Sequence, residues 1–503
     1  MNLNLTPFLP ELFLAGGIVI LLILDLMVKA RKGVFTAVGG VVLLAVVSLV
    51  ALTTQENVGP YLFGAVVQDG ATVYFRLLFA FATILALGML TFSFPHEGEP
   101  YLLMLSSALG MFLLAGANDI VSLFVAFELV SIPSYILAGY HRKDVKSAEA
   151  ALKYVIYGAV SSGLMVYGFS LLYGITGTTN IPNMAKALTG GLQSAPLATS
   201  GVAPLIGLIL TLSGLGYKVA LVPLHFWCPD VYEGSPTPIT AFFSVAPKAA
   251  GFAALYRLAP IFAALGSGSQ AQPDPWWGAI GSNGLTAVTL FTVASAITMT
   301  YGNLAAIWQD GLKRLLAYSS IAHAGYILMG FAAMAALPAG EGRDLAAMAI
   351  LFYLAVYMFM NLGAFFIVDY IERREGSDKI AVIKGWGKTH PVPALLMAVF
   401  LFSLTGLPPL AGFVGKFYLL AALVKGKLFA LAIIAVANTV VSLFYYVRVI
   451  RDMFLYDPEE GAVSAPGGAP RLAVVLGVAT LVPTLVLGVA FGGLATWIAG
   501  KVM

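Results

Sequence analysis

Hydrophobic residues fall in long blocks along the whole chain, and short polar stretches separate each block from the next. A helix needs roughly 20 consecutive apolar residues to cross the hydrocarbon core of a bilayer. By this length criterion, the chain contains about fourteen such blocks. The pattern therefore predicts an all-α polytopic membrane protein with about fourteen transmembrane helices.

Two of these blocks are interrupted by proline. The block from about residue 203 to 231 contains Pro223, and the block from about 391 to 425 contains Pro408 and Pro409. Proline removes a helix hydrogen bond and clashes with the preceding turn. Broken helices at membrane depth are tolerated where they are buried in protein or line a polar cavity. We therefore predict a broken helix in each of the two blocks.

The breaks also indicate how the chain is divided. A matched pair of broken helices in two halves is the best sequence pointer to a transporter core made of inverted repeats. We place each break in the fourth span of its own five-helix unit. The predicted divisions are N-terminal helices in residues 1–100, inverted repeats in 101–262 and 281–452, and a C-terminal helix in 471–503.

Composition agrees with a membrane protein and limits its chemistry. The chain is 60% hydrophobic and 10% charged, with a mean hydropathy of +0.92, whereas about a quarter of the residues in soluble domains are charged. It contains one cysteine, Cys228. An internal disulfide, a CxxC metal site and an iron–sulfur cluster held by this chain alone are therefore excluded.

Basic residues collect in alternate loops. One set of loops includes Arg142, Lys313 and Arg373, and the other set includes Lys186 and Lys427. The richer set holds about sixteen basic residues against about five, and Lys and Arg accumulate on the cytoplasmic side. This predicts that both termini lie outside the cytoplasm. We expect a bacterial plasma membrane, because the composition is rich in Ala, Gly and Val and no transit peptide is visible.

Few charged residues fall inside the predicted spans and away from their ends, namely Lys153, Lys218, Lys248, Lys416 and Glu128. A charge at mid-bilayer costs at least about 2.5–3.5 kcal/mol, so such residues usually mark ion paths or substrate sites. Burial favours the neutral form of a lysine. A carboxylate about 6 Å away favours the charged form by roughly 3 kcal/mol at an effective dielectric of 20. Moving Glu128 relative to a lysine would therefore switch the protonation of that lysine.

Two histidines are candidates for the same path. His323 lies in mid-span in the second predicted repeat, and His225 lies at the first break; imidazole is suited to relaying protons near neutral pH. Simpler readings stay open, because a single lysine could be a structural partner of Glu128 and His225 could only cap its helix. The GFVGKF segment is not a phosphate loop, since Phe417 follows the lysine.

Four segments carry a resemblance to a known family: FELVSIPSYIL (127–137), LVPLHFWCPDVYEGSPTPI (221–239), YSSIAHAGY (318–326) and LPPLAGFVGKF (407–417). They are similar to the antiporter-like membrane subunits of NADH:quinone oxidoreductase, respiratory complex I, over essentially the whole chain. Within that family, PDVYEGSPTP resembles subunit N, whereas subunits L and M typically read PDAH followed by APTP.

The resemblance implies fourteen helices, inverted repeats of helices 4–8 and 9–13, and a central polar axis that conducts protons. Matched by motif, Glu128 resembles the helix-5 glutamate, Lys218 its helix-7 partner, Lys248 the connecting helix-8 lysine and Lys416 the helix-12 lysine at the exit. Lys153 would be an additional pairing lysine in helix 6. The two repeats depart from internal symmetry in one respect, because Lys218 precedes its break whereas Lys416 follows its own.

These observations predict a proton-translocating subunit driven by quinone reduction in partner subunits. Glu128 would change its coupling to Lys218, and the released proton would pass through Lys248 and His323 to Lys416. We expect no cofactor or metal on this chain, and NADH, FMN, iron–sulfur clusters and quinone in partner subunits. Expected partners are other antiporter-like and small membrane subunits, the peripheral redox arm and lipid, with no nucleic acid.

Other functions stay open at this point. A subunit of a multisubunit cation/proton antiporter would show sodium-dependent proton exchange without a dehydrogenase, and membrane-bound hydrogenases contain similar subunits. In a non-conducting scaffold, the charges would only hold helices together.

Overall fold

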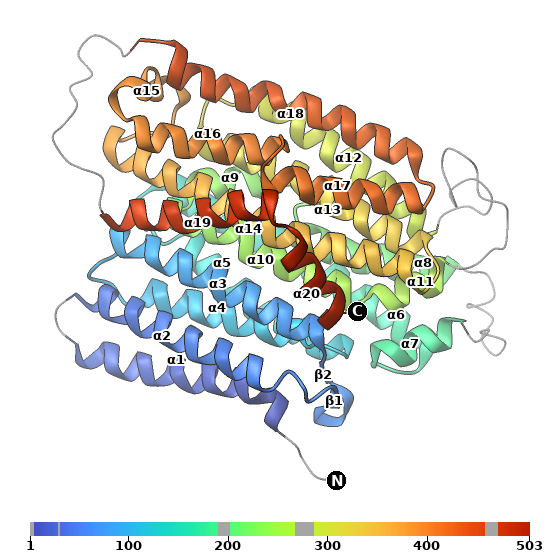
Figure 1. Ribbon diagram of the computed structural model, residues 1–503. Helices are drawn as coiled ribbons and strands as arrows, with labels where there is room; N and C mark the ends of the chain where they lie inside the picture. The colour runs from blue at the N-terminus through green and yellow to red at the C-terminus, as the bar shows by residue number, and fades with distance from the viewer. Residues whose placement is uncertain (1–4, 29–30, 190–201, 267–285, 458–470, 503) are drawn as a thin grey trace.

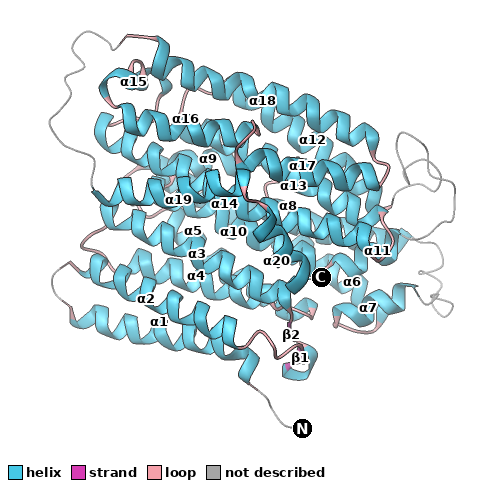
Figure 2. Ribbon diagram, viewed as in Figure 1, coloured by secondary structure: helices cyan, strands magenta, loops and turns pink. Residues whose placement is uncertain are grey.

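The computed structural model describes residues 5–28, 31–189, 202–266, 286–457 and 471–502, and most of these residues are helical. Long helices lie side by side in one bundle (Figures 1 and 2). The helices are α1 (Leu9–Met27), α2 (Lys32–Thr53), α3 (Gly70–Ser93), α4 (Glu99–Ala115), α5 (Ile120–Ala138), α6 (Val145–Thr176), α7 (Ile181–Thr189), α8 (Val202–Lys218), α9 (Trp227–Gly234), α10 (Thr237–Arg257), α11 (Ala259–Gly266), α12 (Ala287–Ile307), α13 (Leu312–Ala336), α14 (Glu341–Glu375), α15 (Trp386–Thr389), α16 (Pro391–Thr405), α17 (Ala411–Lys425), α18 (Phe429–Leu455), α19 (Arg471–Val489) and α20 (Gly492–Val502).

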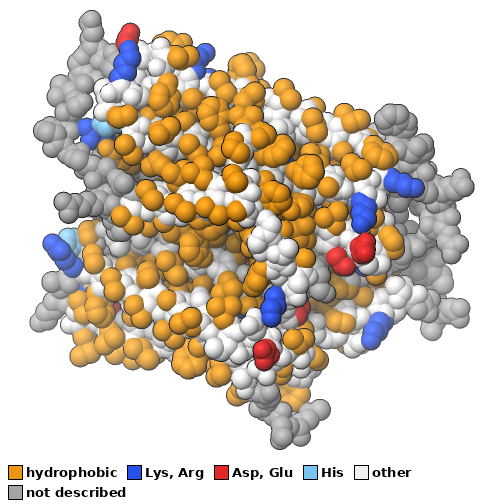
Figure 3. All heavy atoms as spheres, in the orientation of Figure 1, with side chains coloured by type: hydrophobic (Ala, Val, Ile, Leu, Met, Phe, Trp, Pro, Cys, Tyr) orange, Lys and Arg blue, Asp and Glu red, His pale blue; other side chains and the backbone are white. Residues whose placement is uncertain are grey.

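The helices have the length and composition of membrane spans. Among the described residues, ten helices are long and apolar enough to cross a bilayer, or up to eleven if the bent pair α19 and α20 forms one span. Three shorter apolar helices, α4, α8 and α16, accompany them. Hydrophobic side chains are spread across the visible face (Figure 3). The all-α polytopic fold is therefore confirmed, whereas the count of fourteen spans is not established.

Both predicted helix breaks are present. Helix α8 ends at Lys218 and α9 begins at Trp227, whereas α16 ends at Thr405 and α17 begins at Ala411. Gly406 follows α16 with a φ of +90°, a backbone conformation in which glycine is strongly favoured. The division into inverted repeats stays a prediction, and residues 281–285 of the second unit lie outside the described residues.

Three helices form the centre of the bundle. More than nine tenths of the most apolar segment of α10, α13 and α14 is buried by the rest of the chain, whereas α1, α2 and α18 are largely uncovered. In Figure 1, α1 and α2 lie at one edge of the bundle and α18 lies at the other. Side chains on α10, α13 and α14 are therefore the ones most shielded from lipid.

Several small elements were not predicted from the sequence. Strands β1 (Gly59–Tyr61) and β2 (Val66–Gln68) form a short antiparallel hairpin between α2 and α3. Helices α7 and α11 are short and lie at the ends of long spans, and α20 bends by 85° from α19. Such short segments carry too few residues for hydrophobic periodicity to reveal them.

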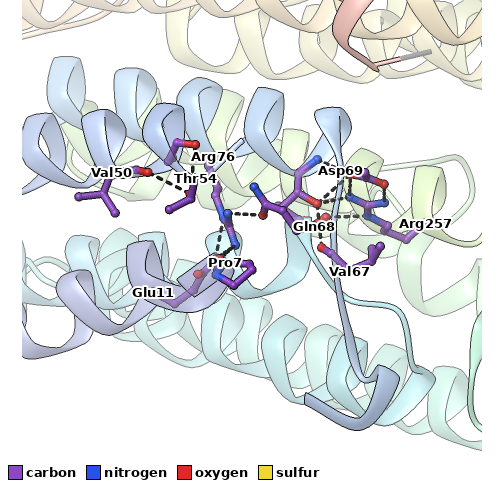
Figure 4. A network of polar contacts seen from close by, with 12 residues as sticks. Pro7, Glu11, Val50, Thr54, Val67, Gln68, Asp69, Arg76 and Arg257 are labelled. Carbon is purple, nitrogen blue, oxygen red and sulfur yellow. Dashed lines mark hydrogen bonds and ion pairs between the residues drawn. The ribbon is translucent and has the colours of Figure 1, made fainter. Parts of the chain in front are cut away.

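A buried network of two arginines fastens the N-terminal helices to the rest (Figure 4). Arg76 on α3 donates hydrogen bonds to Glu11 on α1 at 2.8 Å and to Gln68 at 2.7 Å. Arg257, at the end of α10, donates to both carboxylate oxygens of Asp69 at 2.6 and 2.8 Å. Burial alone would raise the pKa of Asp69, but the adjacent Arg257 guanidinium outweighs burial and lowers this pKa to about 2.

Candidate functional site

Lys218 is the last residue of α8, and its side chain points into the bundle. Its side chain is 2% exposed. Its Nζ donates a hydrogen bond to Oγ of Ser131 on α5 at 3.0 Å and lies 5.4 Å from the ring centroid of Phe127. Ser131 donates its own hydroxyl hydrogen to the carbonyl oxygen of Phe127. The serine therefore presents a lone pair to the lysine.

Glu128 lies on the same face of α5 as Ser131, one helical turn earlier. It is half-buried, and its Oε1 accepts a hydrogen bond from Ser162 of α6 at 2.5 Å. In the part of the chain that the structure describes, Glu128 and Lys218 form no direct ion pair. The predicted coupling between these two groups would therefore act at longer range than an ion pair.

Lys248 lies on the central helix α10 and is 2% exposed. Its Nζ donates a hydrogen bond to Oγ of Ser320 on α13. It also lies 5.7 Å from the ring centroid of Tyr232 on α9. Gly251, one turn further along α10, packs against the side-chain stem of Lys218. Helix α10 therefore connects the surroundings of the first two lysines.

His323 lies on α13, one turn after Ser320, and is 2% exposed. Its Nδ1 is 2.7 Å from the hydroxyl oxygen of Tyr353 on α14, and its Nε2 is 3.4 Å from the hydroxyl oxygen of Tyr446 on α18. Tyr446 in turn shares a hydrogen bond with Ser319. The imidazole thus has a hydroxyl partner on each side, and each hydroxyl can donate or accept a proton.

Lys416 lies on α17 close to the second break, and 5% of its surface is exposed. Its Nζ donates a hydrogen bond to the carbonyl oxygen of Thr405, the last residue of α16, at 2.9 Å. The Nζ also lies 4.3 Å from the ring centroid of Tyr326, a distance at which an ammonium is attracted to the ring face.

These groups follow one another through the bundle, and we call Lys218, Lys248, His323 and Lys416 the lysine row. Ser320, His323 and Tyr326 occur at intervals of three residues on α13, so they share one face of that helix. This face contacts Lys248 at one end and Lys416 at the other. The spacing in the YSSIAHAGY segment could have revealed this face. The contacts to Ser131, Tyr353 and Tyr446 depend on distant segments and could not be read from the sequence.

Besides Glu128, two of the residues selected from the sequence lie outside the lysine row. Lys153 lies in α6, a candidate membrane span, as expected, and its side chain is 35% exposed and forms ion pairs with Glu149 at 2.6 Å and Asp230 at 2.5 Å. The sequence did not indicate this exposure, which arises because this position of α6 faces Asp230 on α9. His225 is buried between α8 and α9, where its ring centroid lies 4.5 Å from that of Tyr301.

The fold and the row together define a class of protein. Charged side chains inside a membrane bundle are costly and usually mark an ion or proton path. Lys218, Lys248 and His323 are buried in contact with hydroxyl groups, and Lys416 is buried with its ammonium bonded to a backbone carbonyl. The chain is a polytopic membrane protein with ionisable groups arranged through its interior.

Comparison with known proteins identifies the family within that class. Residues 117–442 match the family described as NADH:quinone oxidoreductase/Mrp antiporter, TM. NADH-quinone oxidoreductase subunit N of Chlorobium chlorochromatii is 42% identical over 499 residues, which cover 97% of this chain and 93% of the relative. The chain belongs to the NADH-quinone oxidoreductase subunit N family.

Solved structures share the architecture over nearly the whole chain. A chain of respiratory complex I from Thermus thermophilus with bound aureothin is 31% identical, with a TM-score of 0.76 and coverage of 97% of this chain and 98% of that chain. A chain of the Mrp complex from Dietzia sp. DQ12-45-1b is 21% identical, with a TM-score of 0.80 and coverage of 99% and 98%. The second likeness shows the fold alone.

Proposed function

We propose that this chain is a proton-translocating membrane subunit of NADH:quinone oxidoreductase, and that the lysine row is its proton path. The observation that carries the proposal is the face of α13 on which Ser320, His323 and Tyr326 lie between Lys248 and Lys416. Membership of the subunit N family supports the same function.

In this proposal, each buried group has a separate role. A change in the coupling of Glu128 alters the charge of Lys218, and the proton passes through Lys248 and His323 to Lys416 before it leaves. Moving one proton against about 150 mV costs roughly 3.5 kcal/mol at about 2.3 kcal/mol per 100 mV. Two charges about 6 Å apart interact by roughly 3 kcal/mol at a dielectric of 20. A change at one pair is therefore of the right size to drive one proton.

The redox chemistry belongs to other subunits in this proposal. NADH, FMN, iron–sulfur clusters and quinone are bound by partner subunits, and this chain lies in the membrane beside other antiporter-like and small membrane subunits. We place it in a bacterial plasma membrane with both termini on the non-cytoplasmic side. In agreement with that placement, α1 begins and α20 ends towards the same end of the bundle (Figure 1). His225 and Lys153 stay candidates that the lysine row does not include.

The test uses the assembled complex with Lys416→Met in this chain. Inverted membrane vesicles should retain a complex that contains flavin and iron, but NADH-driven proton uptake should fall at least about tenfold, since a buried proton carrier has been removed. Lys425→Met is the matched control, because Lys425 is exposed at the end of the same helix. It should leave proton uptake unchanged.

The same experiment separates the alternative functions. Assembly of a normal complex with full pumping in Lys416→Met would exclude Lys416 from the path and favour a scaffold. If the tagged chain purifies with membrane subunits only and without flavin or iron, a cation/proton antiporter becomes the better proposal. Sodium-dependent proton exchange would then be the next assay.

A further inference from the structure

A cluster of six charged side chains lies outside the lysine row, around the end of α9. It comprises Lys146, Glu149 and Lys153 from α6, Asp230 and Glu233 from α9, and Arg314 from α13, and we call it the elbow clamp. Three basic and three acidic groups balance in charge. Five of the six line a pocket of about 140 Å³.

Arg314 is the centre of the clamp. Its Nη1 lies 2.8 Å from Asp230 and 2.8 Å from Glu233, so one guanidinium holds both acids of α9. From the opposite side, Lys153 pairs with Asp230 at 2.5 Å and Lys146 pairs with Glu233 at 2.8 Å. Helix α9 is therefore held between α6 and α13.

The same two elements that the clamp joins also form the surroundings of Lys248. Helix α9 contributes Tyr232, whose ring lies 5.7 Å from the Nζ of Lys248. Helix α13 contributes Ser320, which accepts the hydrogen bond from that Nζ. Ser320 lies six residues after Arg314 on the same helix. The distance between Tyr232 and Ser320 around Lys248 therefore depends on how firmly Arg314 holds α9.

A second contact from the same turn of α13 strengthens this arrangement. Lys313 donates a hydrogen bond to the carbonyl oxygen of Ser235 at 2.9 Å, directly after α9, and lies 3.6 Å from Glu372 on α14. Two consecutive residues of α13 thus bind α9 and the turn between α9 and α10. The ion pairs of the elbow clamp itself are partly exposed, and such pairs are weak and screened by salt, so the clamp can open and close.

We propose that the elbow clamp is a gate for Lys248, in which Arg314 is the positioning residue that keeps α9 against α13. With the clamp closed, Lys248 is shielded from water at the end of the bundle that carries the clamp. With the clamp open, α9 moves away and protons gain access to Lys248. This inference rests on the proposed function, because it assigns the access side of the same path.

Cys228 offers a direct readout of the gate. It is the only cysteine in the sequence, it lies on α9, and it is fully buried. Opening of α9 should expose its thiol to a maleimide added from the clamp side, and mass spectrometry of this chain measures the modification. The labelling rate reports movement of α9 whether or not protons are pumped.

The experiment compares Arg314→Met with wild type in the assembled complex. We expect Cys228 to be labelled at least about tenfold faster and the number of protons moved per NADH to fall at least about twofold. Arg314→Lys should fall between the two, since a lysine lacks the planar fork with which a guanidinium holds two carboxylates. Lys388→Met, which removes an exposed ion pair with Asp457, is the control and should change neither value.

Unchanged labelling and unchanged proton number in Arg314→Met would overturn the gate. If that variant does not assemble, Arg314→Lys and Asp230→Asn provide the same comparison, and unchanged labelling in both would overturn it equally. Faster labelling in a complex whose pumping does not depend on Lys416 would instead support the gate as a mobile element and refute the proposed path.

Discussion

Replacing Ser320 with alanine isolates one step of the proposed path. Ser320 supplies the acceptor for the hydrogen bond from Lys248, and its side chain is fully buried. The substitution removes one oxygen atom from the surroundings of Lys248 and leaves the lysine itself in place. Its effect therefore reports on the protonated form of Lys248 and not on the presence of the side chain.

The expected size of the effect follows from the type of bond. A hydrogen bond to a charged group contributes about 1.5–3 kcal/mol, and 1.36 kcal/mol corresponds to about a tenfold change in the affinity of a group for its proton. Losing the serine should therefore reduce the affinity of Lys248 for its proton by about ten- to a hundredfold. Passage of a proton through this site should slow by a similar factor.

The assay is the initial rate of NADH-driven proton uptake in inverted vesicles, with the amount of assembled complex measured by its flavin content. Ser320→Ala should lower the rate by at least about tenfold. Ser295→Ala is the matched control, because Ser295 is also a fully buried serine but donates to the backbone carbonyl of Gly325 on α13. Equal rates in the two variants would refute the reasoning.

Two further predictions concern the second break and the N-terminal network. Gly406→Ala should lower the stability of the chain by about 1 kcal/mol, because the φ of +90° disfavours a side chain. It should also reduce proton uptake, because the new Cβ would lie 3.0 Å from Cδ of Lys416. Unfolding in detergent measures the loss of stability, and NADH-driven uptake in inverted vesicles measures the loss of proton transport. Asp69→Asn should destabilise the chain by about 3 kcal/mol, since it leaves Arg257 buried without its carboxylate. The pKa of Asp69 is lowered to about 2 from 3.8, so the stabilisation by this pair is complete above about pH 4 and is lost as the pH falls through 2. Thermal unfolding at pH 5 and at pH 7 should therefore show the same difference in stability between variant and wild type.

The fold and the members of the lysine row could be predicted because membrane burial leaves strong signals in a sequence. Long apolar blocks fix the helices, and proline fixes the two breaks. Lys218, Lys248, His323 and Lys416 stand out because ionisable residues are rare inside such blocks. The structure confirms that all four are buried.

The remaining features depend on how distant segments meet. Position 153 lies eight residues inside α6, yet its neighbour Asp230 from α9 draws Lys153 towards the polar end of the bundle. Sequence spacing carries no information on that contact. The clamp formed by Arg314 was missed for the same reason, because its two acids precede it by more than eighty residues.

The two helix breaks differ in sequence but place a cation in the same electrostatic position. Lys218 is the last residue of α8, and Lys416 reaches back to the carbonyl of Thr405, the last residue of α16. The carboxyl end of a helix carries a partial negative charge and favours a cation. Each break therefore stabilises an ammonium group at the carboxyl end of the helix that precedes it, α8 or α16. The two sites differ in the group that accepts the hydrogen bond from the lysine, which is the Ser131 hydroxyl for Lys218 and the Thr405 carbonyl for Lys416. The hydroxyl of Ser131 can pass a proton on from Lys218, whereas the carbonyl of Thr405 has no proton to exchange. In the proposed path, the proton therefore reaches Lys416 from the side of His323.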